Sequence, residues 1–161
     1  MRRLLLIGLG LLPVILFGFA TDAAAGGNDG HSANFFVVLA GANERPVPAT
    51  ASDLTGTAKV RISFDTKVVC WKLKYDTSET VIAAHIHHGA AGTAGPVTFG
   101  FFNPPASTVV VNTGCRQAAS PSELATVAGI AADPSNYYVN VHTTIFPGGA
   151  GRGQLTERGN S

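Results

Sequence analysis

The sequence predicts an all-β fold, either an antiparallel sandwich or a Greek-key barrel, of about eight strands with one short helix. Apolar and polar residues alternate along residues 58–64 and again along residues 69–75, which is typical of strands with one face in the core. Elsewhere, helical periodicity is scarce, and turn residues, among them 19 glycines and 9 prolines, separate short apolar segments. These patterns favour a sheet of short strands.

The first expected strand, residues 34–40, is a compact apolar run rich in Phe and Val, which predicts a strand covered on both faces. The two alternating segments follow it, and Asp65-Thr66-Lys67 between them is short enough for a hairpin. Further strands are expected at residues 81–87, 96–102, 107–111, 137–143 and 152–156.

One segment predicts a helix instead. Ser120, Pro121 and Glu123 have the spacing of a capping box with proline at the first helical position. Residues 124–131 continue the pattern, and Asp133-Pro134 should end it. We therefore expect one short helix that crosses between strands.

The beginning of the chain is typical of a secretory signal peptide over residues 1–25. Arg2 and Arg3 precede an apolar run, residues 4–20, and Ala23-Ala24-Ala25 offers a cleavage site. We expect a polar linker over residues 26–33, the β domain over residues 34–156 and a flexible tail over residues 157–161. Cleavage would give a secreted or periplasmic domain without a membrane span, whereas an uncleaved run would be a membrane anchor.

Composition restricts the partners. The chain has 13% charged residues and a formal net charge of +1, without a run of basic residues, which argues against nucleic acid. Loss of Arg2, Arg3 and Asp22 with the signal would leave nine basic and nine acidic residues of the original 11 and 10. A domain with this balance is not expected to have an electrostatically driven partner, which leaves an unnamed extracellular protein or surface component.

Cys70 and Cys115 are the only cysteines, and an oxidising compartment would allow them to pair. A catalytic thiol would need a nearby base, and nothing in the sequence around Cys70 supplies one. We expect a disulfide.

Four of the five histidines fall in two short motifs, His85-Ile86-His87-His88 and Asn140-Val141-His142-Thr143. Residues i and i+2 of a strand share a face, so His85 and His87 can point at one place, and His142 would complete a three-nitrogen set for copper or zinc. His88 should lie on the other face or in the turn that follows. The alternative is structural, with these histidines hydrogen-bonded to strand ends and loops.

Two further features carry weaker signals. Residues 146–153 form a glycine-rich turn with the single cation Arg152, which is either an anion-attracting lip beside the histidines or only a hairpin loop. Glu44 lies in a turn without a partner carboxylate nearby in sequence, so a catalytic role for it is not expected.

Several segments, in this order along the chain, are similar to the CHRD domain, the repeat first described in chordin: residues 39–44, 84–87, 92–97, 124–125, 137–143 and 147–155. The resemblance extends from Phe35 to Leu155. It implies an exported or extracellular domain with an immunoglobulin-like β-sandwich fold and without an assigned biochemical activity.

A fainter similarity is to copper-zinc superoxide dismutases, which are Greek-key β-sandwiches. That similarity would make His85, His87 and His142 copper ligands and Arg152 the guide for the anionic substrate. The zinc-site residues and the bridging histidine of that family are absent.

Two functions follow from these observations. The favoured one is a non-enzymatic binding or structural module of the cell exterior, with a histidine metal site for copper or zinc. The other is a copper-dependent, superoxide dismutase-like redox enzyme.

Overall fold

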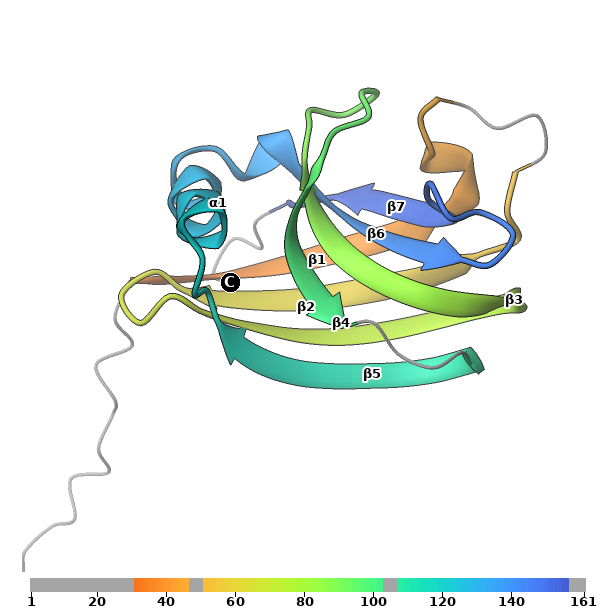
Figure 1. The fold of residues 1–161 in the computed structure, drawn as a ribbon, viewed down its shortest axis with the longest axis horizontal. Coiled ribbons are helices and arrows are strands. Elements are labelled where there is room, and N and C mark those ends of the chain that lie inside the picture. Colours follow the sequence, from red (N-terminus) through yellow and green to blue (C-terminus); the bar gives the residue numbers. More distant parts are fainter. Residues whose placement is uncertain (1–30, 47–50, 103–106, 157–161) are drawn as a thin grey trace, which may run out of the picture.

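The computed structural model describes residues 31–46, 51–102 and 107–156. The fold is mostly β with one short helix (Figure 1). Its strands are β1 (Ser32–Ala40), β2 (Thr55–Ser63), β3 (Val68–His88), β4 (Val97–Phe102), β5 (Ser107–Gln117), β6 (Tyr137–Thr143) and β7 (Gly151–Gln154). The helix is α1 (Pro121–Ala132), and two 3₁₀ turns are η1 (Gly41–Asn43) and η2 (Pro134–Asn136). The expected signal peptide, the tail and most of the expected linker lie outside the described residues.

The strands close into a barrel rather than forming two clearly separate sheets. All pairs are antiparallel: β1 pairs with β2, β2 with β3, β3 with β6, β6 with β7, and β7 returns to β1 through Ala40 and Arg152. Strands β4 and β5 add to β3 outside this ring of five. The predicted all-β class is correct. The pairing gives a barrel of five strands with two added strands, and it does not clearly give the immunoglobulin-like sandwich that the resemblance implied.

Strand β3 accounts for the difference in strand number. The expected strands at residues 69–75 and 81–87 are one strand of 21 residues, so the described part of the chain has seven strands. The polar residues between them are bonded to the segment before β2: Thr77 donates to Asp53, and Ser52 donates to Glu79. The pairing register shifts at this point, so β3 changes neighbours there without a break.

Alternation in the sequence builds the core. Even-numbered residues of β2 from Ala58 to Ile62 are almost fully buried, whereas Lys59 and Arg61 between them are exposed. The prediction that β1 is covered on both faces is wrong, because its burial also alternates and Val38 is 62% exposed. The barrel interior contains Val37, Leu39, Val60, Leu73, Ile86, Val139 and Val141.

Helix α1 confirms the predicted capping box and lies over one end of the barrel (Figure 1). The Ser120 hydroxyl accepts a hydrogen bond from the Glu123 backbone N–H at 3.2 Å, and the Glu123 carboxylate accepts one from the Ser120 N–H at 3.3 Å. Val127 and Ile130 pack into the core from this helix. No helix in the described residues is long and apolar enough to cross a membrane.

Substitution of Ser120 by alanine is expected to lower the free energy of unfolding by about 1 kcal/mol, because the N–H of Glu123 loses its acceptor. Urea denaturation measures the change. Ser122→Ala is the matched control: the Ser122 hydroxyl lies 3.0 Å from the Ser120 hydroxyl but does not cap the helix, so a smaller loss is expected. An equal loss in both variants would contradict the capping role.

Candidate metal centre

Strands β3 and β6 bring the three predicted histidines together. In their antiparallel register Ala83 lies opposite His142, and His85 lies opposite Asn140. The histidine side chains therefore project from the same face of this pair of strands, opposite to the face that carries Ile86, Val139 and Val141 into the core. Their ligand nitrogens all lie within 4.8 Å of one another.

The contact between His87 and His142 is the closest in the group. Their Nε2 atoms are 3.2 Å apart, and both residues are only 5% exposed. The ring centroid of His85 lies 4.8 Å from that of His142 and 5.8 Å from that of His87. His85 is half-buried, so the group reaches from the interior toward the surface.

Two backbone carbonyls fix the tautomers of the buried pair. His87 Nδ1 lies 2.9 Å from the Gly95 carbonyl oxygen, and His142 Nδ1 lies 3.0 Å from the Pro147 carbonyl oxygen. A carbonyl oxygen only accepts, so each Nδ1 carries the hydrogen and donates it. In the neutral rings, both Nε2 atoms are then acceptors whose lone pairs face each other.

Burial keeps both rings neutral. Desolvation lowers the pKa of His87 to about 4, and the nearby Arg152, His85 and His142 contribute in the same direction. Desolvation also lowers the pKa of His142. A proton shared between the two Nε2 atoms is therefore disfavoured at neutral pH. A cation that accepts lone pairs from nitrogen would instead satisfy both atoms.

The spacing fits a transition metal. Zn–N bonds of about 2.0–2.1 Å in tetrahedral geometry place two ligand nitrogens ~3.4 Å apart. The His87–His142 pair is close to this separation, and the ligand nitrogen of His85 lies within 4.8 Å of both. Three imidazoles suit copper or zinc and do not suit calcium or magnesium, which prefer oxygen.

The other two residues that the sequence places near the site, His88 and Arg152, differ in their exposure. His88 is exposed on the opposite face, as expected, and its ring packs against Tyr137. Arg152 is 3% exposed, its guanidinium donates to the Thr93 carbonyl at 2.7 Å, and it lies 3.5 Å from the centroid of the Tyr138 ring. It lies on β7, opposite Asn140 of β6, and the glycine-rich segment before it connects these two strands. Arg152 is thus held close to the histidines but is not an exposed cation.

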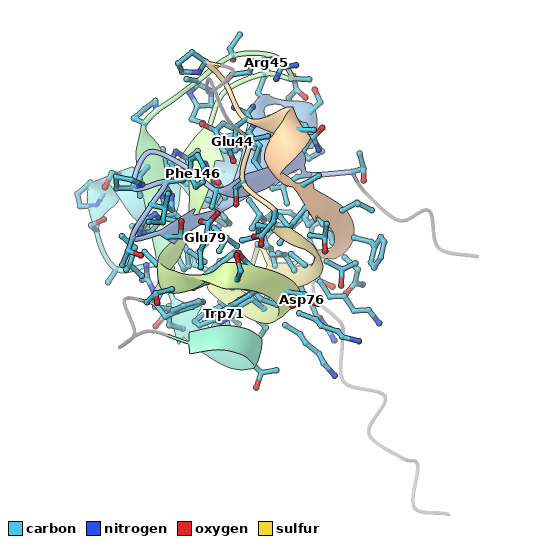
Figure 2. The ribbon with its side chains drawn as sticks, turned by 90° about the vertical axis from the view of Figure 1, so that its right-hand side faces the viewer. Glu44, Arg45, Trp71, Asp76, Glu79 and Phe146 are labelled. Atoms are coloured by element: carbon cyan, nitrogen blue, oxygen red, sulfur yellow. A yellow bond between two sulfur atoms is a disulfide. The ribbon has the colours of Figure 1, made fainter. Side chains whose placement is uncertain are left out.

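Glu44, which the sequence placed in an unremarkable turn, is buried beside the site. It follows η1, and Figure 2 shows it on the same side of the barrel as Phe146. Asn140 Nδ2 donates to its Oε2 at 3.5 Å. Gly149, with a φ of +143°, lies against both side chains, and a Cβ atom there would fall 2.4 Å from Glu44 Oε2. No sequence signal marked this contact, because Glu44 and Asn140 are 96 residues apart.

Desolvation raises the pKa of Glu44 from 4.5 to about 7, although the charge of Arg152 opposes the shift. A carboxyl whose pKa is higher in the folded than in the unfolded state favours folding most below pH 4.5, and this contribution is lost as the pH rises to 7.

Glu44→Gln is therefore expected to flatten the pH dependence of stability between pH 4.5 and 7, by at most about 3 kcal/mol. Urea unfolding at several pH values measures the effect. The Asn43→Ala variant, which changes an adjacent side chain without an ionisable group, should keep the shape of the wild-type pH profile. An unchanged profile in Glu44→Gln would contradict the burial argument.

Comparison with known proteins identifies the domain. The sequence model of the CHRD domain matches residues 35–155, so the chain belongs to the CHRD domain family. No curated protein and no solved structure matches the chain. The fainter similarity to copper-zinc superoxide dismutases accordingly gains no support from these comparisons.

Proposed function

We propose that this CHRD domain is an exported, non-enzymatic binding module in which His85, His87 and His142 hold one copper or zinc ion. The observation that carries the proposal is the 3.2 Å contact between two buried Nε2 atoms whose Nδ1–H groups are both directed to carbonyls. That arrangement is the usual one for metal-bound histidines, in which a hydrogen bond from the second ring nitrogen orients the ring.

Export is supported by the disulfide and by the sequence of residues 1–25. Disulfides persist in oxidising compartments and are rare in the cytosol. The proposed organisation is a cleaved signal over residues 1–25, a linker over 26–33, the domain over 34–156 and a tail over 157–161.

Metal titration tests the proposal. The protein, stripped with chelator and dialysed, is titrated with zinc and with copper, and bound metal is counted by elemental analysis. We expect one ion for each chain. His88→Ala is the matched control, because His88 comes directly after His87 on β3 but lies on the opposite face. Equal stoichiometry in wild type and in a His85→Ala, His87→Ala, His142→Ala triple variant would refute the site.

A superoxide dismutase-like activity is the alternative. It would convert two superoxide ions and two protons into dioxygen and hydrogen peroxide, with copper alternating between two oxidation states. Proximity of the Arg152 charge to His87 favours it, because a cation beside the site attracts an anionic substrate. The 3% exposure of Arg152 weighs against it. The decay rate of a pulse of superoxide in the presence of the copper-loaded protein distinguishes the two functions. A binding module would leave this rate unchanged. An enzyme would accelerate the decay, and the wild-type protein would do so more than the Arg152→Met variant.

A further inference from the structure

The outer face of β2 and β3 carries four cations, Lys59, Arg61, Lys72 and Lys74, which we call the basic face. We propose that the basic face binds a linear acidic polysaccharide, a chain of sugars bearing carboxylate or sulfate groups. This inference does not rest on the histidine group, since the two sites have no residue in common.

Strand register gathers these cations. β2 and β3 are antiparallel neighbours, with Lys59 directly opposite Lys72 and Lys74 directly opposite Thr57. Alternation turns all four side chains outward, and all four are exposed. Like charges directly opposite each other on a sheet destabilise it. The Lys59–Lys72 pair therefore opposes folding, as expected of a pair that serves binding.

Acidic residues are few among the described residues of this face. On the paired segments of β1, β2 and β3, Asp76 is the acidic residue that shares the outer face, and it lies at the last pair of the β2–β3 ladder. Figure 2 shows Asp76 and Trp71, both on β3, well separated in this view from Glu44 beside the histidine site. The chain is nearly neutral as a whole, so the three lysines Lys59, Lys72 and Lys74 concentrate positive charge on this face.

A groove accompanies the charge. A cavity of about 580 Å³ is lined by Phe36 of β1, by Lys59, Arg61 and Lys72, and by the Cys70–Cys115 disulfide. A lining that combines exposed cations with a half-buried aromatic ring suits a chain of sugar rings, which present apolar faces and anionic substituents at the same time.

Other polyanions fit this groove less well. Duplex DNA is read by a helix or a two-stranded ribbon that enters its major groove. Single-stranded nucleic acid requires several aromatic side chains on which successive bases stack, and Phe36 is the aromatic side chain that β1, β2 and β3 present on this face. An anionic bilayer is a flat surface and favours protruding apolar groups over a concave groove.

Binding of the full chain to polygalacturonate and to dextran sulfate tests the inference, with EDTA present so that no metal at the histidines takes part. We expect binding that weakens as salt is added. The Lys59→Gln, Lys72→Gln double variant should bind about 25-fold more weakly, because each lysine beside an anionic surface contributes about fivefold to the affinity. Its thermal midpoint should be unchanged or raised, because the like-charge pair is gone.

A matched control lowers the net charge by the same two units elsewhere. Ala125→Glu with Ala128→Glu places the charges on exposed positions of α1, and we expect binding to stay as in wild type. Tighter binding to one polymer identifies carboxylate or sulfate as the preferred group. The inference is overturned if neither polymer binds, if neutral dextran binds equally well, or if the lysine double variant binds as wild type does. Tighter binding to vesicles containing phosphatidylglycerol or to a single-stranded oligonucleotide would also overturn it.

Discussion

Zinc is expected to stabilise the folded protein, and substitution of either His87 or His142 by alanine is expected to abolish that stabilisation. At a free zinc concentration 100 times the dissociation constant, a ligand that binds only the folded state adds about 2.7 kcal/mol to the free energy of unfolding. Loss of one nitrogen from the 3.2 Å pair removes the contact on which the site depends. We expect the affinity to fall at least about a hundredfold, as loss of even a residue that only orients a ligand costs about 10–100-fold.

Urea unfolding with and without zinc measures this effect. The metal-free variants should fold, because the substituted ring faces away from the barrel core. His88→Ala should respond to zinc as wild type does, since its ring packs on Tyr137 instead. If His142→Ala were stabilised by zinc as strongly as wild type, the ion would have to bind elsewhere on the chain.

Removal of the disulfide is expected to lower the free energy of unfolding by about 4 kcal/mol, the value that loop-closure entropy gives for a separation of 45 residues. Cys70 and Cys115 lie directly opposite each other on β3 and β5, with Cα atoms 4.0 Å apart. The bridge thus ties β5, which lies outside the ring of five strands, to the longest strand of the barrel. The paired Cys70→Ser, Cys115→Ser variant tests this by urea denaturation.

Reduction of the wild-type protein by dithiothreitol is the control for the serine variant, and both should lose the same stability. Zinc affinity should be unaltered in the folded variant, because the bridge is on the half of β3 that pairs with β5 and the histidines are on the half that pairs with β6. A loss below about 1 kcal/mol would contradict the loop-closure account.

Local patterns in the sequence were sufficient for much of the fold. Alternation identified β2 and the first half of β3, the serine-proline-glutamate spacing identified α1, and cysteine counting identified the disulfide, which is confirmed. Each of these signals comes from neighbouring residues or from chemistry that allows one pairing only. The histidine group was also foreseeable, because two of its members are two residues apart on one strand.

Long-range geometry was not available from these patterns. The sequence pattern divides β3 into two strands. In the structure, Thr77 between these two segments donates a hydrogen bond to Asp53, which lies 24 residues earlier in the chain. Closure into a barrel depends on the pairing of Ala40 with Arg152, which no local pattern announces.

The same limit applies to charge. Net charge and the absence of a basic run argued against an electrostatic partner, yet the register of β2 and β3 assembles Lys59 and Lys72 into one face. Burial likewise converts Glu44 from a turn residue into a neighbour of the histidine site. The sequence alone does not predict the basic face or the burial of Glu44, because both depend on which strands become neighbours in the fold.

X-ray absorption at the metal edge of the zinc- or copper-loaded protein tests the histidine site most directly. We expect the spectrum of three imidazole nitrogens at about 2.0–2.1 Å in wild type, and a reduced imidazole contribution or loss of bound metal in His142→Ala. A wild-type spectrum dominated by oxygen ligands, or one that His142→Ala leaves unchanged, would contradict the proposed site.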